Sequence, residues 1–479
     1  MLNSRCPVYL GTDASMGSAQ WWRKVDNLSL RKHNPPPVCD KDFLIGLNEF
    51  FGKLCEDADY QEPVPIHIDP NTHSAPRLCE HDVMMALSRI KKTASGPDCI
   101  PYWVWKDNAT ILAPIITTIW NLSLSLHNWP KSWKEANINP LHKVDAPSHY
   151  PDYRGINITL SVIARCFEKV VHHKFMKQIL EANICPSEFA YRDSCSCIDA
   201  MITMQYNTLK SLDEKDNRCV RLFTMDFSKA FDNVKHSLLS QKLKALELNP
   251  YLTNWYLNFL KDRKQRVPFK GTVCDWQNVN KGTTQGSVSD PHLFNILIND
   301  LTIIDSPCIS LVKYADDTTL LCAVMNSSFD YSIDMVEQYI NWSKNNCMPC
   351  NVEKCKELIF RKKNCTDVFA PINNIQKVDS LMVLGVTFQS NCGFNEHVKS
   401  KLVEANRGLH ILRCLRKEGY TQDEVDYFFN SVILPKITYG LPIYGASPPE
   451  LTVVQNFLRR CFKRKYISYL IDMQGLVDK

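Results

Sequence analysis

The chain has 479 residues, of which 44% are hydrophobic and 22% are charged. These proportions are those of a globular protein with a substantial core, and they exclude collagen-like and disordered chains. The net charge of +5 is too small to indicate a nucleic-acid partner by itself, but residues 401–479 hold 12 Lys and Arg against 8 Asp and Glu and carry most of the excess. At about 150 residues per domain, the length predicts about three domains or one large enzyme with several lobes.

The first 85 residues read as an N-terminal linker or extension. Proline-rich and turn-rich stretches surround a single helical pattern at 43–55. Further along, residues 137–160 show only short apolar pieces among turn residues, and residues 163–184 return to helical spacing.

One stretch, residues 108–130, contains no charged residue. Its prolines, serines and threonines argue against a membrane span, and we expect no membrane partner. The spacing predicts instead an amphipathic helix that buries one apolar face. That face comprises Leu112, Ile115, Ile119, Leu122 and Leu126.

After residue 216 short β-type runs alternate with helical segments, which predicts an α+β or α/β core. We expect strands at 220–225, 267–269, 309–314, 318–324, 357–360 and 381–388. We expect helices at 238–248, 250–260, 291–300 and 335–344. From about residue 395 onward the pattern is helical and increasingly basic.

The 20 cysteines are irregularly spaced in a long chain, which argues against a small disulfide-bonded scaffold. The first residues lack the apolar run of a signal peptide, so we expect reduced thiols and an intracellular location, nuclear or cytoplasmic. A zinc site could be read from four nearby cysteines, Cys347, Cys350, Cys355 and Cys365, but their spacing does not match known zinc motifs and no histidine lies among them. Zinc stays open as a minor alternative.

Two acidic clusters lie beside predicted strands. Asp226 directly follows the run 220–225, and Asp316 and Asp317 lie between the runs 309–314 and 318–324. Neighbouring residues of a flat strand point to opposite faces, so this Asp-Asp pair can converge only at the tight turn of a hairpin. Three converging carboxylates suit two divalent cations and phosphoryl transfer. The alternative for each cluster alone is an ordinary turn or a helix cap.

These motifs carry a family resemblance. The segments 226–232 and 314–317, with Thr284-Gln-Gly-Ser-Val-Ser-Asp290, resemble the palm motifs of reverse transcriptases. The sequence is most similar to reverse transcriptases of non-LTR, LINE-like or jockey-type retrotransposons. Further matches occur in family order from about residue 84 to residue 465, among them Trp133-Lys-Glu-Ala and Pro435-Lys-Ile-Thr-Tyr-Gly.

The resemblance implies an α+β right-hand polymerase with fingers, a palm built on an antiparallel sheet, and a helical thumb. It divides the chain after the N-terminal extension (1–85) into a fingers extension (86–123), a reverse transcriptase domain (124–388), and a thumb with a basic C-terminal segment (389–479). The implied function is RNA-directed DNA polymerisation for a mobile element, with an RNA template, a DNA primer and deoxynucleoside triphosphates as partners.

The resemblance also assigns the metal site. Asp226, Asp316 and Asp317 would bind two Mg²⁺ ions, for which Mn²⁺ could substitute, and the backbone carbonyl of Phe227 is a further candidate ligand. Lys354 is a candidate general acid for the departing pyrophosphate, although the adjacent lysine at 356 could take this role.

The remaining implied roles concern the incoming nucleotide. Lys143 and Arg154 would grip the triphosphate, and Gln285 and Gly286 would lie near the sugar and the template base. Phe231 would abut the sugar and exclude a ribose 2′-hydroxyl. Read without the family, the two cations are surface charges and the phenylalanine is a core residue.

Four positions depart from the family pattern: Gly155, Glu188, Thr284 and Asp290. The aspartate adds a charge near the nucleotide and could reduce activity. The roughly 80 residues before the first fingers match are too few for an endonuclease, so we expect target nicking to come from elsewhere. A decayed or domesticated palm that binds RNA as a scaffold remains the alternative function, and an intron maturase or a telomerase the alternative class.

Overall fold

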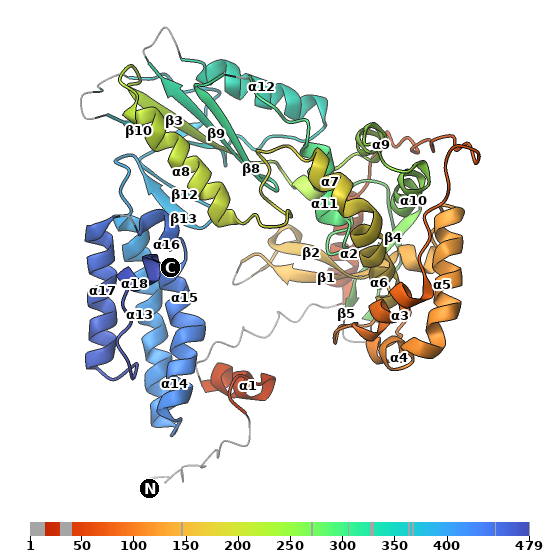
Figure 1. The fold of residues 1–479 in the computed structure, drawn as a ribbon, viewed down its shortest axis with the longest axis horizontal. Helices are drawn as coiled ribbons and strands as arrows, with labels where there is room; N and C mark the ends of the chain where they lie inside the picture. Colours follow the sequence, from red (N-terminus) through yellow and green to blue (C-terminus); the bar gives the residue numbers. More distant parts are fainter. Residues whose placement is uncertain are drawn as a thin grey trace.

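The computed structural model describes residues 15–28, 41–144, 147–269, 272–304, 306–325, 330–362, 365, 368–445 and 447–478. The described chain forms a mixed body of helices and sheets, beside which the C-terminal helices stand as a separate bundle (Figure 1).

A five-stranded sheet lies at the centre, in the order β11-β10-β3-β9-β8. Its strands are β3 (Cys219–Met225), β8 (Ile309–Tyr314), β9 (Asp317–Val324), β10 (Lys356–Arg361) and β11 (Gln376–Val378). All neighbours are antiparallel except β10 and β11, which are parallel. The predicted strands of this region are confirmed, because runs rich in β-branched and aromatic residues suit the pleated sheet.

Alternation along β3 sends side chains into two different cores. Phe223 packs with the residues of α12 (Ser332–Asn345) in one core, and Leu222 packs with those of α8 (Cys197–Asp213) in the other. The two helices therefore cover opposite faces of the sheet, as Figure 1 shows. A sheet buried on both faces is a rigid support for groups at its strand ends.

A second sheet, in the order β2-β1-β4-β7, contains a hairpin that the sequence pattern missed. Its strands are β1 (Glu135–His142), β2 (Tyr153–Thr159), β4 (Arg263–Arg266) and β7 (Gln277–Val279). The antiparallel pair β1–β2 occupies most of residues 137–160, which showed no strand signal. Pro140 faces Gly155 in this pair, and both residue types are depleted in strands.

Helix α2 (Lys41–Leu54) corrects the interpretation of residues 1–85 as a peripheral extension. Its Leu44, Leu47 and Phe51 are buried against Ile138 and Tyr153 of the second sheet. The predicted helix at 43–55 exists, but it belongs to the packing of this sheet.

The helices beside the second sheet share one hydrophobic core with the α12 face of the central sheet. They are α3 (Glu80–Ser88), α4 (Tyr102–Asp107), α5 (Ala109–Ser125), α6 (Val162–Val171), α7 (Lys177–Asn183), α9 (His236–Ala245), α10 (Pro250–Leu260) and α11 (Asp290–Ile298). A π-helix (His172–Met176) joins α6 to α7, and short strands β5 (Pro268–Phe269) and β6 (Thr272–Val273) form a small hairpin. The helices predicted at 163–184, 238–248, 250–260, 291–300 and 335–344 are confirmed with small changes of boundary.

Helix α5 exists, but the prediction of its buried face was wrong. The side chain of Trp120 is fully buried and stacks on Phe167 at a centroid distance of 4.8 Å, whereas Ile115 is 58% exposed. Apolar residues surround most of this helix, so periodicity allowed two faces, and the packing of the large indole selected the other one. Within the described ranges no helix is long and apolar enough to span a membrane.

The C-terminal region begins with the hairpin of β12 (Ser380–Val383) and β13 (Val386–Gln389). The single strand predicted at 381–388 is wrong, because Leu384 and Gly385 have φ values of 46° and 85° and reverse the chain between two antiparallel strands. The bundle follows with α13 (Asn395–Lys417), α14 (Gln422–Phe428), α15 (Leu434–Thr438), α16 (Leu441–Tyr444), α17 (Pro448–Lys463) and α18 (Gln474–Val477). Helix α1 (Ala19–Leu28) packs on this bundle, where the buried Trp21 donates its indole N–H to Glu424 at 2.8 Å.

Candidate active site

A cavity of about 790 Å³ opens between the end of β3, the tip of the β8–β9 hairpin, the β1–β2 hairpin and α2. Apart from Lys356, every residue that the sequence singled out for catalysis, metal binding or nucleotide binding lines it. These residues are Lys143, Arg154, Asp226, Phe227, Phe231, Gln285, Gly286, Asp316, Asp317 and Lys354. Residues up to 211 positions apart in sequence therefore meet in one place.

The three aspartates are held by main-chain geometry. Asp226 directly follows the last residue of β3, and its carbonyl accepts a hydrogen bond from the N–H of Asn351 at 2.8 Å. The β8–β9 register pairs Tyr314 with Asp317, which leaves a two-residue turn in which the non-glycine residue before Asp316 has a φ of 55°. The expected tight hairpin is confirmed, and its type of turn requires positive φ.

The aspartate cluster carries unbalanced negative charge. Partial removal from water, and then the neighbouring Asp316 and Asp226, raise the pKa of Asp317 to about 6. Burial and the Asp226 carboxylate also raise the pKa of Asp316. The buried Oδ2 of Asp226 has no hydrogen-bond partner among the described residues. A cluster of hard oxygen donors of like charge fits a divalent cation, because a cation would relieve this repulsion.

As they stand, the side chains are not closed around an ion. Within the described ranges, no group of three or more His, Cys, Asp or Glu residues is arranged to hold a metal. This result covers the three aspartates and also the four cysteines considered as a zinc site, of which Cys350 and Cys355 have their sulfurs 3.6 Å apart.

Three cations also line the cavity. Lys143 and Arg154 project from the β1–β2 hairpin, and Lys229 joins them from the turn after β3. Burial, followed by the charges of Arg154 and Lys229, lowers the pKa of Lys143, and the carboxylate of Asp232 opposes this shift. Sequence reasoning missed Lys229, although its place three residues after Asp226 in the palm motif was a usable signal.

Phe231 and the Gln285–Gly286 turn also line the cavity. The ring of Phe231 stacks on Phe294 at a centroid distance of 4.3 Å. The amide of Gln285 donates to the Asp232 carboxylate at 2.8 Å, a partner that the sequence did not single out. Gly286 has a φ of 92°, a conformation in which a side chain would be strained.

Asp290, the departure from the family pattern, is buried behind this turn. Its Oδ2 accepts a hydrogen bond from the N–H of Gly286 at 3.3 Å. Burial is the main cause that raises the pKa of Asp290 to about 6. Burial thus disfavours the charged form of Asp290, although a carboxyl with this pKa is still mostly ionised at pH 7, and the side chain supports the turn.

Lys354 lies at the border of a second cavity of about 600 Å³ that shares Asp226 and Asp317 with the first. Its side chain is 67% exposed, and its Nζ lies 3.6 Å from Oδ2 of Asp226. Lys356 lines only the second cavity and donates to Gln376 at 2.6 Å. The structure therefore brings Lys354, and not Lys356, to the cavity that contains all three aspartates.

Comparison with known proteins gives the family. Residues 142–388, more than half of the chain, match the reverse transcriptase (RNA-dependent DNA polymerase) family. This chain is a member of the reverse transcriptase family. Its α+β fold is the right-hand polymerase arrangement of that family, with the central antiparallel sheet as palm.

Curated relatives come from mobile elements. The chain is 26% identical over 377 residues to a probable RNA-directed DNA polymerase from transposon BS of Drosophila melanogaster, covering 73% of this chain and 41% of the relative. It is also 26% identical over 417 residues to the RNA-directed DNA polymerase from mobile element jockey of the same organism, covering 82% of this chain and 44% of the relative. The chain thus spans less than half the length of these relatives.

Among solved structures, telomerase from Candida albicans in complex with a fragment of telomeric RNA is similar with a TM-score of 0.41. The sequence identity is 11%, and the similarity covers 79% of this chain and 68% of the telomerase chain.

The basic segment at the end of the C-terminal bundle lies on and after α17. Its cations are solvent-exposed and flank the 41% exposed ring of Phe462. They are Arg459, Arg460, Lys463, Arg464 and Lys465. The guanidinium of Arg416, from α13, lies 5.5 Å from the ring centroid of Tyr466 and extends this surface.

Proposed function

We propose that this chain catalyses RNA-directed DNA synthesis, copying the RNA of a non-LTR retrotransposon into cDNA. One observation carries the proposal: a single cavity is lined both by the aspartates at the strand ends and by three cations, Lys143, Arg154 and Lys229. A metal-bound deoxynucleoside triphosphate has the matching polarity, because its phosphates bridge cations on the protein and metal ions on carboxylates.

We assign the metal site to Asp226, Asp316 and Asp317, with the carbonyl of Phe227 as a further ligand. Two Mg²⁺ ions, or Mn²⁺ in their place, would activate the primer 3′-hydroxyl and neutralise the departing pyrophosphate. The aspartates would supply the oxygen ligands, and binding requires their carboxylates to reorient toward one another. Asp317 must also lose the proton that its raised pKa favours below about pH 6.

The chain's own side chains would orient the nucleotide. Lys143 and Arg154 bind the triphosphate, and Lys229 adds a third cation to the same cavity. Phe231, held by its stacking on Phe294, presents a rigid ring to the sugar and disfavours a 2′-hydroxyl. Gln285, oriented by Asp232, faces the sugar and template base. Lys354 lies close enough to the aspartates to protonate the departing pyrophosphate.

The RNA template and DNA primer would lie between fingers and thumb. The second cavity, bounded by the β12–β13 hairpin and by Asp226, is the place for the primer end. The basic surface of α17 would hold the duplex through its phosphates. In this assignment residues 86–123 extend the fingers, 124–388 form the catalytic domain, and 389–479 form the thumb.

The test is primer extension on an RNA template with Mg²⁺ and all four deoxynucleotides. The wild-type chain is expected to extend the primer, and Asp316→Ala is expected to abolish the product. Asp334→Ala is the matched control, because it removes one exposed aspartate from α12 outside both cavities. Thermal unfolding of each variant checks that folding is retained.

Two outcomes would contradict the proposal. A wild-type chain that makes no metal-dependent product but still binds RNA would leave only the scaffold alternative. A product that survives Asp316→Ala would show that polymerisation occurs elsewhere or comes from a contaminant.

A further inference from the structure

Two thiols lie within reach of each other beside the aspartate cluster. The sulfurs of Cys350 and Cys355 are 3.6 Å apart. Cys355 is fully buried, whereas Cys350 is partly exposed. A small oxidant from solvent can therefore reach one sulfur, and the other is protected but close enough to react with it.

The turn that joins these cysteines is tied to the active site by backbone hydrogen bonds. Cys350 forms a β-bridge with Phe227, and the next residue, Asn351, donates its N–H to the carbonyl of Asp226 at 2.8 Å. The backbone N–H groups of Lys354 and Cys355 donate hydrogen bonds to the carbonyl of Asn351 at 3.0 and 3.2 Å. The two sulfurs thus lie at the ends of the turn that presents Lys354 to Asp226.

We propose that Cys350 and Cys355 form an oxidation site at which a peroxide produces an intramolecular disulfide. The sulfur of Cys350 attacks one oxygen of hydrogen peroxide and breaks the O–O bond; that oxygen stays on the sulfur as a sulfenic acid, and the other oxygen leaves as water. The Cys355 sulfur then displaces the hydroxyl from the Cys350 sulfur, which releases a second water and forms the S–S bond. Two thiols lose two hydrogens and two electrons, and the peroxide gains them.

Closing the disulfide has a mechanical consequence. The sulfurs must move from 3.6 Å to a bond length of about 2.05 Å, and the Cβ–S–S–Cβ torsion must adopt its own preferred angle. The turn is short, so the change is passed to the backbone around Lys354 and to its contact with Asp226. This part of the inference rests on the proposed function, since it concerns polymerase activity; formation of the disulfide does not.

The chemistry is tested by treating the folded chain with hydrogen peroxide, alkylating the remaining thiols and digesting with trypsin. Cleavage after Lys354 separates the two cysteines, so the disulfide yields two peptides joined through sulfur that separate on reduction. Cys347→Ser is the matched control: it removes the exposed neighbouring cysteine and is expected to retain the joined peptides, whereas Cys350→Ser is expected to lose them. Two alkylated thiols in the wild type, or a Cys347–Cys350 bond, would overturn the site.

The consequence is tested separately by primer extension before oxidation, after oxidation and after reduction with dithiothreitol. The wild type and Cys347→Ser are expected to lose activity with peroxide and to recover it with the reductant. Cys350→Ser is expected to have the same activity before and after peroxide treatment. Joined peptides with unchanged activity would refute the coupling to Lys354. A reduced wild type without activity would contradict the proposed function and leave the peptide result standing.

Discussion

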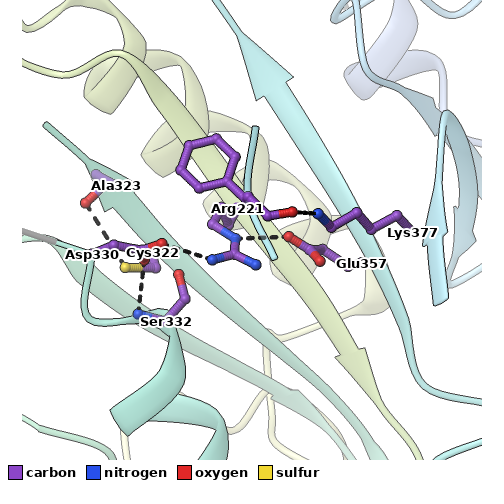
Figure 2. A network of polar contacts seen from close by, with 8 residues as sticks. Arg221, Cys322, Ala323, Asp330, Ser332, Glu357 and Lys377 are labelled. Atoms are coloured by element: carbon purple, nitrogen blue, oxygen red, sulfur yellow. Dashed lines mark hydrogen bonds and ion pairs between the residues drawn. The ribbon is translucent and has the colours of Figure 1, made fainter. Parts of the chain in front are cut away.

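Arg221, on β3, is the side chain whose loss should destabilise the palm most. Its Nε donates to Glu357 of β10 at 2.7 Å, and one terminal nitrogen donates to Asp330, before α12, at 2.7 Å (Figure 2). The side chains of Arg221 and Glu357 are 2% and 0% exposed, and that of Asp330 is 13% exposed. One guanidinium therefore binds two carboxylates and joins two strands and the start of a helix across the sheet that ends in Asp226.

We expect Arg221→Met to reduce the free energy of unfolding by about 3–5 kcal/mol, the cost of leaving a buried charge without its partner. Methionine fills much of the volume of the arginine side chain, so little cavity is left. The loss of stability therefore comes mainly from the buried Glu357 carboxylate, which no longer has its cationic partner. The double variant Arg221→Met/Glu357→Leu removes both buried charges and should recover a large part of this loss.

Urea unfolding monitored by tryptophan fluorescence measures both variants at about pH 7. Asp334→Ala on α12 is the control, because its exposed carboxylate should matter little. A loss below about 1 kcal/mol for Arg221→Met would show that water reaches the network and screens it. A double variant as unstable as the single one would show that the guanidinium acts through packing, including its contacts with the rings of Phe223 and Phe369.

Three further predictions concern the cavity and the fingers. Phe231→Ala should raise ribonucleotide incorporation relative to deoxynucleotide incorporation in primer extension, and an unchanged ratio would remove the ring from sugar selection. Asp290→Asn should stabilise the fold by about 1–3 kcal/mol near pH 7. Folding raises the pKa of this carboxyl from 3.8 to about 6, so the wild-type protein loses stability as the pH rises from about 4 to above 6. Asparagine does not ionise, so the stability difference between the variant and the wild type should vanish near pH 4 in thermal melts. Trp120→Ala should cost about 3–5 kcal/mol, whereas Ile115→Ala should change stability by about 0.5 kcal/mol or less; equal losses would contradict the observed face of α5.

The palm was the most predictable part of the fold. Its strands are strongly apolar runs, and the tight turn at Asp316 could be inferred because two adjacent strand residues cannot face the same site. The β1–β2 hairpin was not predictable from pattern, since Pro140 and Gly155 weaken the strand signal and the pairing between β1 and β4 depends on residues more than 100 positions away. For α5, several apolar faces were available, and burial of the Trp120 ring decided among them.

The same division holds for the site. The sequence by itself determined which residue types carry the chemistry and their order along the chain, because the motifs around Asp226, Gln285 and Asp316 are local and each specifies its own turn. Only the tertiary structure decided that Lys229 joins the other two cations in the cavity, that Asp232 orients Gln285, and that Lys354 rather than Lys356 reaches the aspartates. These relations depend on how strands and turns from separate parts of the chain are packed against one another, and the charge and burial that they create exist only after that packing.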